Sequence, residues 1–219
     1  NSLLSKSLGE QNQEAANRAA GNGMFLMFVA VVIFMLFGIF GARPFFEMQS
    51  DVTETVENGI TYSSICCIFS LGIFMEILGE RLLQSTGRTI HSMITQSTGA
   101  IINIILDPIL IHGWFGLPAM GVAGAAVATV IGQWVAAIMA VIFNITSNPD
   151  VQFGLKYLRP DPKVMKKILS VGVPSIIMMA IGSVMNFCMN QVFLGFADQH
   201  GQTPANVFGI YFKLQSIFL

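Results

Sequence analysis

Long apolar runs alternate with short polar connections along the whole chain. A helix needs about 20 residues to cross a hydrocarbon layer of about 30 Å. Six runs approach or exceed that length, and they cover residues 23–42, 60–79, 90–112, 120–143, 168–197 and 205–219. The pattern predicts an all-α fold, a polytopic bundle of transmembrane helices.

Composition supports a membrane protein over a soluble one. Of the 219 residues 53% are hydrophobic and 11% charged, whereas a soluble domain has about a quarter charged residues. The formal net charge of −1 gives no basic excess, so we expect no nucleic-acid partner. The lipid bilayer is the expected partner.

Basic residues mark one side of the membrane. Nine of the 11 lie before the first run or in every second connection, namely Lys6, Arg18, Arg81, Arg88, Lys156, Arg159, Lys163, Lys166 and Lys167. The positive-inside rule therefore places these connections in the cytoplasm. The longest of them contains Pro149, Pro160 and Pro162 and is typical of a linker between two bundles. Because the chain begins without Met and ends inside an apolar run, we expect it to be a piece of a longer protein.

No catalytic motif is found. The sequence has no phosphate loop, zinc helix, nucleophile elbow or dinucleotide fingerprint, so we expect no enzyme. Cys66, Cys67 and Cys188 lie inside apolar runs, as buried thiols do, and we predict neither a disulfide nor a bound metal there.

Asp107 is the leading candidate for chemistry, because an acid inside a membrane helix costs about 2.5–3.5 kcal/mol on insertion scales. Asn103 lies four residues earlier and on the same helical face. Pro108 cannot donate to the carbonyl of Ile104, and that carbonyl is therefore a candidate third oxygen ligand. Such oxygens suit Na⁺, and the carboxylate alone suits a proton. The alternative is that Asp107 only caps a helix or bonds a neighbouring one.

Small residues recur at four-residue spacing in the next run, at Gly124, Ala128 and Gly132. This stripe predicts close helix packing. Thr129 lies beside the stripe, where its hydroxyl either reaches a site on the preceding helix or bonds its own backbone.

Other polar residues in the apolar runs give weaker predictions. Glu76 and Glu80 are four residues apart. They either form a proton-accepting pair, or Glu80 is a solvated or ion-paired residue at the membrane interface. Asn186, Asn190 and Gln191 either line a polar cavity or bond between helices. His91, His112 and His200 fall near helix ends, where a hydrated histidine is expected.

Three segments resemble the MATE family of multidrug and toxic-compound extrusion transporters. They begin at Asn1-Ser2-Leu3, at Gly87-Arg88-Thr89, and at Gly99-Ala100-Ile101; the third continues through Asn103, Asp107-Pro108 and the stretch from Pro118 to Gln133. Such transporters have twelve helices in two six-helix lobes. The resemblance implies that residues 1–146 are the remainder of the first lobe (helices three to six), 147–163 the cytoplasmic linker, and 164–219 the start of the second lobe.

The family's cation or proton site consists of an Asn and an Asp on helix five, a Thr on helix six and an Asp on helix one. The first three correspond to Asn103, Asp107 and Thr129, and the fourth is outside this chain. Some relatives also have an acid on helix seven, where this chain offers only Asn186, Asn190 and Gln191. A second-lobe Na⁺ site of that type is therefore not expected.

The resemblance implies a secondary antiporter in the plasma membrane of a prokaryote. It would exchange Na⁺ or H⁺ for an organic compound, expected to be cationic, with no cofactor and no metal beyond the coupling ion. The remainder of its own chain would be its protein partner. The alternatives are a flippase for lipid-linked oligosaccharides, which would need basic residues in its cavity, and a membrane scaffold packed without a cavity around an inaccessible Asp107.

Overall fold

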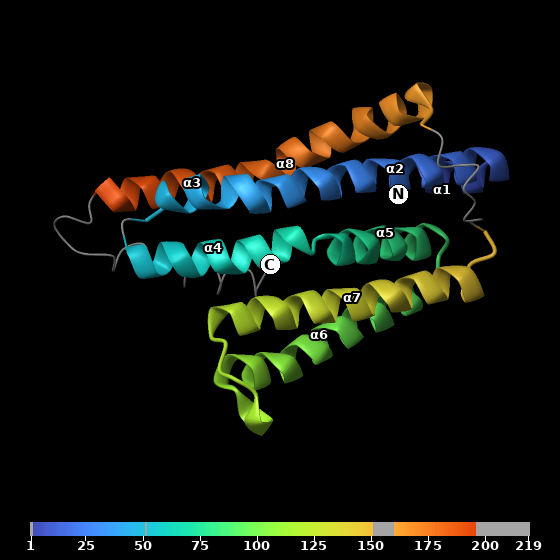
Figure 1. Ribbon diagram of the computed structural model, residues 1–219. Helices are drawn as coiled ribbons and strands as arrows, with labels where there is room; N and C mark the ends of the chain where they lie inside the picture. The colour runs from blue at the N-terminus through green and yellow to red at the C-terminus, as the bar shows by residue number, and fades with distance from the viewer. Residues whose placement is uncertain (1, 51, 151–159, 196–219) are drawn as a thin grey trace.

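The computed structural model describes residues 2–50, 52–150 and 160–195, which form antiparallel helices without a strand (Figure 1). The α-helices are α1 (Ser2–Gly9), α2 (Gln13–Leu36), α3 (Ala42–Glu47), α4 (Thr53–Ile68), α5 (Leu71–Ser85), α6 (Thr89–His112), α7 (Val122–Ser147) and α8 (Pro162–Gly195). A π-helical turn, Phe37–Gly41, joins α2 to α3, and a 3₁₀ turn, Trp114–Gly116, precedes α7. The predicted all-α class is confirmed.

Five of the six predicted membrane segments correspond to helices long and apolar enough to cross a bilayer. Four are continuous spans, Gln13–Glu47, Thr89–His112, Val122–Ser147 and Pro162–Met189. The fifth consists of α4 and α5, which are bent by 55° at a short break. The sixth predicted segment, 205–219, lies outside the described residues.

The bend between α4 and α5 was not predicted, since residues 60–79 form one uninterrupted apolar run. Phe69 and Ser70 separate the two helices. Directly after them, Gly72 lies against Trp134 of α7, and a Cβ on that glycine would be 2.8 Å from the indole ring. The absence of a side chain at Gly72 therefore lets α5 approach α7 closely.

The π-helical turn ends at Gly41, three residues before Pro44. Proline has no N–H for the carbonyl four residues earlier, and its ring crowds the preceding turn. Within the turn, the Gly38 carbonyl accepts a hydrogen bond of 3.0 Å from the Ser64 hydroxyl of α4. A side-chain donor from a neighbouring helix thus satisfies a backbone group in the irregular segment.

Helix α7 is the centre of the bundle and packs against α4, α5 and α6. Its buried residues are mostly small, including the predicted stripe Gly124, Ala128 and Gly132, so the packing role of the stripe is confirmed. Near the other end of α7, Asn144 is buried and donates from Nδ2 to the Gly79 carbonyl of α5 at 2.9 Å.

We call the end of the bundle with α1, the start of α6 and the start of α8 the basic end (Figure 1). It contains the described basic residues that we assign to the cytoplasm, Lys6, Arg18, Arg81, Arg88, Lys163, Lys166 and Lys167. Arg88 pairs there with Asp150 at 3.2 Å. Charged side chains from distant parts of the sequence therefore meet at one end.

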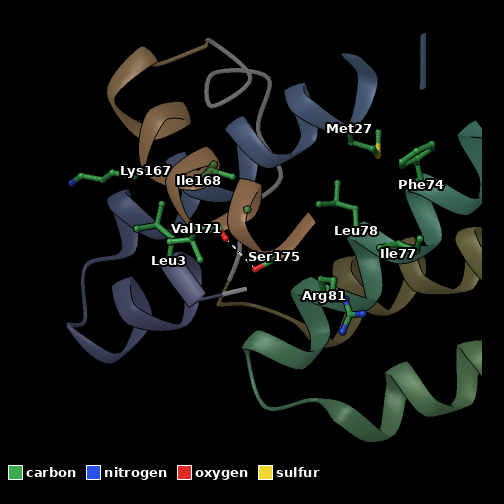
Figure 2. Close-up of a pocket in the computed structure, with 11 residues that line it drawn as sticks. Leu3, Met27, Phe74, Ile77, Leu78, Arg81, Lys167, Ile168, Val171 and Ser175 are labelled. Atoms are coloured by element: carbon green, nitrogen blue, oxygen red, sulfur yellow. Dashed lines mark hydrogen bonds between the residues drawn. The ribbon is translucent and has the colours of Figure 1, made fainter. Parts of the chain in front are cut away.

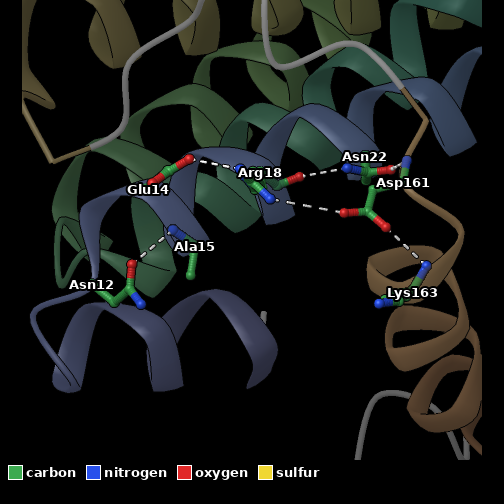
Figure 3. A network of polar contacts seen from close by, with 7 residues as sticks. All are labelled: Asn12, Glu14, Ala15, Arg18, Asn22, Asp161 and Lys163. Carbon is green, nitrogen blue, oxygen red and sulfur yellow. Dashed lines mark hydrogen bonds and ion pairs between the residues drawn. The ribbon is translucent and has the colours of Figure 1, made fainter.

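A polar network ties the start of α8 to α2 at the basic end (Figure 3). The buried Asn22 accepts from the Asp161 backbone N–H at 2.8 Å through Oδ1 and donates from Nδ2 to the Arg18 carbonyl at 2.8 Å. The Asp161 carboxylate accepts from the Lys163 N–H and lies 4.0 Å from the Arg18 guanidinium. The first turn of α8 is thus attached to α2 mainly through one buried amide side chain.

Candidate functional site

Asn103 and Asp107 lie one turn apart on α6, as predicted, and their side chains contact each other. Asn103 donates from Nδ2 to Oδ1 of Asp107 at 3.3 Å. Both residues are partly buried, and among the described residues Asp107 has no other hydrogen-bond partner and no ion pair. The carboxylate does not cap or bond a neighbouring described helix, and α6 continues past Pro108 to His112.

Thr129 of α7 joins this pair across the helix interface. Its Oγ1 accepts from Asn103 Nδ2 at 3.3 Å and donates to the Ala125 carbonyl at 2.9 Å. The two interpretations that the sequence left open for Thr129 therefore hold together, because a hydroxyl both donates and accepts. The structure brings Asn103, Asp107 and Thr129 into one cluster, which we call the Asp107 cluster.

Tyr62 is a fourth member of the Asp107 cluster that the sequence did not reveal. Its hydroxyl lies 3.4 Å from Thr129 Oγ1. Since the single Thr129 proton is directed at Ala125, the tyrosine is left as the donor in this contact. The sequence signal was a tyrosine inside an apolar run, and the packing of α4 against α7 brings it to Thr129.

Two glycine contacts bring α6 and α7 close enough for these hydrogen bonds. On one side of Thr129, a Cβ on Gly132 would be 2.8 Å from the Gly99 carbonyl oxygen of α6. On the other side, a Cβ on Gly124 would be 2.5 Å from the Leu110 carbonyl oxygen. Backbone therefore touches backbone on both sides of the cluster, which holds the short side chains of Thr129 and Asn103 within reach.

The chemistry available in the Asp107 cluster is that of oxygen ligands. Asp107 Oδ2 and Asn103 Oδ1 have no partner among the described residues, and Thr129 Oγ1 lies beside them. Hard cations bind such oxygens, and a carboxylate also binds a proton. In the described part of the chain no group of three or more His, Cys, Asp or Glu residues could hold a metal ion, so the residues do not match a transition-metal site.

Glu76 and Glu80 lie one turn apart on α5, and their side chains have different surroundings. Glu76 is half-buried, and its Oε1 lies 3.8 Å from the position that a Cβ on Gly99 would take. The prediction of a solvated or ion-paired Glu80 is wrong, because its side chain is only 4% exposed and has no described cation beside it. It lies against α6, where Thr95 and Gln96 contact its carboxyl group. The packing of α5 on α6 buries a position that the sequence placed at the interface.

The predicted polar residues of α8 are not close to the Asp107 cluster. Asn186 is exposed on α8 and does not line the pocket described below. The side chain of Asn190 lies outside the described residues. Gln191 donates to the Met48 carbonyl, which is an interhelical bond. Asn186 and Asn190 therefore stay predictions.

An apolar pocket of about 750 Å³ lies between α1, α2, α5 and α8 (Figure 2). Met27, Phe74, Leu78 and Ile168 are among its apolar lining residues. Its charged lining residues are two cations, Arg81 on the α5 wall and Lys167 on the α8 wall. Neither has an ion-pair partner among the described residues, so this pocket has no acid to attract an organic cation.

Comparisons with known proteins agree with this architecture. Residues 1–109 match the family model described as MatE. The multidrug export protein MepA of Staphylococcus saprophyticus is 25% identical over 211 residues, which are 96% of this chain and 45% of that protein. The chain thus spans about half the length of this relative.

Solved structures match over almost the whole chain. The inward-facing conformation of a multidrug resistance MATE family transporter of the MOP superfamily has a TM-score of 0.86 at 24% identity, over 99% of this chain and 48% of that one. The outward-facing conformation described in the same words has a TM-score of 0.78 at 25% identity, over 95% of this chain and 45% of that one. The relatives are transporters and export proteins rather than enzymes, and this chain is a multi-pass cell-membrane protein that belongs to the MatE family.

Proposed function

We propose that this chain is part of a secondary transporter that exports organic compounds in exchange for Na⁺ or H⁺, and that the coupling ion binds in the Asp107 cluster. The observation that carries the proposal is the carboxylate of Asp107, held beside Asn103 and Thr129 with one oxygen lacking a described partner. The relative MepA is named a multidrug export protein, which supports the direction of transport.

Two ions fit the cluster in different ways. A proton needs only the Asp107 carboxylate, whereas Na⁺ would also use the Asn103 amide oxygen and the Thr129 hydroxyl. The Ile104 carbonyl would be a further ligand, since Pro108 has no N–H to bond it. The described side chains supply fewer oxygens than a hard cation normally takes, so a bound Na⁺ would need water or residues outside this chain.

Coupling requires that ion and substrate favour different conformations. A ligand that binds two states equally shifts neither. We propose that an ion in the Asp107 cluster stabilises one packing of α6 and α7 against the rest of the first lobe, residues 1–146, and that the substrate stabilises another. The pocket and the partly accessible Asp107 favour such a transporter over a scaffold packed without a cavity.

The decisive test is transport by the full-length protein in liposomes, with Na⁺ and proton gradients imposed separately and a lipophilic organic cation as the probe. We expect one gradient to drive transport and the Asp107→Asn variant to lose that dependence. The matched control is Glu57→Gln, which removes an exposed acid of α4 that is paired with Arg43. Gradient-driven transport that survives Asp107→Asn unchanged would contradict the assignment.

A second candidate function is the movement of an amphipathic anion, of which a lipid-linked oligosaccharide is one example. The observation in its favour is that the charged residues lining the apolar pocket are the two cations Arg81 and Lys167. Transport of an anionic amphiphile that falls in the Arg81→Gln and Lys167→Gln variants, with no transport of the organic cation, would support this candidate over the first.

A further inference from the structure

Glu80 is a buried carboxyl group that is not part of the proposed coupling site. Its side chain is 4% exposed, and it lies between α5 and α6 near the basic end. The residues around it are equally buried on the α6 side, with Thr95 at 0% and Ser92 at 2%. An ionised carboxylate in such a place is costly unless cations or several donors compensate for the lost water.

The described structure offers Glu80 few donors. Gln96 donates from Nε2 to Glu80 Oε2 at 2.8 Å. Thr95 Oγ1 lies 3.3 Å from Glu80 Oε1 and 2.8 Å from the Ser92 carbonyl oxygen. The Thr95 hydroxyl has one proton. The Ser92 carbonyl is the nearer of the two oxygens and can only accept, so the proton is directed at it. The remaining contact between Thr95 and Glu80 is then a hydrogen bond only if Glu80 supplies the proton.

No described cation offsets a negative charge on Glu80. The helices packed against α5 are α1, α2, α6 and α7. Arg81 of α5 bonds Gln84, and α7 has no titratable residue. The titratable groups on the facing parts of the other helices have partners elsewhere, namely Lys6 with Glu10, Arg18 with Glu14, Arg88 with Asp150, and His91 against Phe143. The remaining neighbour is Glu76, an acid one turn away on α5, which supplies no positive charge.

We infer that Glu80, Thr95 and Gln96 form a second proton-binding site, in which Glu80 is protonated in this conformation and donates to Thr95 Oγ1. On release of the proton, the Thr95 hydroxyl turns from the Ser92 carbonyl to the carboxylate, which then accepts from both Thr95 and Gln96. The site is distinct from the Asp107 cluster, because Thr95 and Asp107 are separated by about 18 Å along α6 at 1.5 Å per residue.

Polar side chains lie between this site and the solvent at the basic end. Ser92 Oγ accepts from Gln84 Nε2 at 2.9 Å, and Gln84 Oε1 accepts from the exposed Arg81 at 2.8 Å. Ser92 is the residue whose carbonyl bonds Thr95. We therefore expect the proton on Glu80 to exchange with the solvent at the basic end.

Infrared spectroscopy of the full-length protein tests this inference directly. At neutral pH the Glu80→Gln variant is expected to lose a carboxylic-acid C=O band that the wild type shows. Glutamine retains the shape of the neutral acid and can donate to Thr95, so the variant should fold normally. The matched control, Glu14→Gln, removes an exposed, ion-paired acid and should remove only a carboxylate band. Loss of a carboxylate band in Glu80→Gln would overturn the inference.

A second variant tests the geometry. Thr95→Val removes the hydroxyl that accepts the Glu80 proton, so the carboxylic-acid band should shift to higher frequency as its hydrogen bond is lost. A band that does not move would refute the Thr95 contact. Because these measurements need no transport, their outcome is independent of whether the proposed antiport activity is found.

Discussion

Asn103 of α6 donates from Nδ2 to Thr129 of α7 at 3.3 Å, and the same amide group donates to Asp107 at 3.3 Å. One amide group therefore links the carboxylate of one helix to the hydroxyl of the next. Any ion that displaces these hydrogen bonds acts on two helices at once. This relationship connects the proposed ion site with the packing of α6 on α7.

Thr129→Val should weaken ion dependence without unfolding the protein. The substitution keeps the volume but removes the oxygen that accepts from Asn103. Loss of a hydrogen bond of about 1–1.5 kcal/mol corresponds to about a tenfold change in affinity. The measurement is the ion concentration at half-maximal transport, and Thr129→Ser, which retains the oxygen, should remain close to the wild type. Equal behaviour of the Val and Ser variants would exclude a role for the hydroxyl.

Tyr62→Phe should have a smaller effect of the same kind. The tyrosine hydroxyl contacts Thr129 at 3.4 Å, which is long for an O–H donor, so its removal costs less than loss of Thr129 itself. We expect a change of about twofold to threefold in the half-maximal ion concentration. The double variant Tyr62→Phe, Thr129→Val should be no worse than Thr129→Val alone, and additive losses would show that Tyr62 acts elsewhere.

Gly132→Ala should disrupt the Asp107 cluster through the backbone. The added Cβ would lie 2.8 Å from the Gly99 carbonyl oxygen, which cannot turn away as a flexible side chain would. Overpacking of this type costs about 1–3 kcal/mol and should lower both thermal stability and ion affinity. Gly182→Ala is the matched control in a helix, since nothing described lies within 4 Å of its Cβ position. A Gly132→Ala protein as stable and active as Gly182→Ala would show that the helices separate easily.

Asn22→Ala should loosen the start of α8. It removes the acceptor of the Asp161 N–H and leaves the Arg18 carbonyl without its side-chain donor, at a cost of about 1–3 kcal/mol. Hydrogen exchange at Asp161 should become faster. Arg18→Ala tests the exposed ion pair with Asp161 at 4.0 Å, and such pairs contribute about 0–1 kcal/mol. If Arg18→Ala had the larger effect, the ion pair rather than the buried amide would hold α8.

Much of the fold could be predicted because the apolar run that marks a membrane helix is formed by residues close together in the sequence. Length and hydropathy predicted five of the helical spans that the structure describes, including α7 with its small-residue stripe. The one-turn spacing of Asn103 and Asp107 was enough to predict that their side chains share a face. These features depend on residues close together in the sequence, and helix geometry alone determines which of their side chains lie on the same face.

The tertiary structure decided the contacts that cross between helices. The break after Ile68, the burial of Glu80 and the partner of Tyr62 depend on how α4, α5, α6 and α7 are aligned. That alignment follows from close contacts such as Gly132 with Gly99 and Gly72 with Trp134. A hydropathy pattern records how apolar a helix is but not its rotation or its neighbour. The sequence alone therefore identified Asp107, Asn103 and Thr129 as candidates, whereas the contact between Asn103 and Thr129, and the burial of Glu80, result from the packing of separate helices.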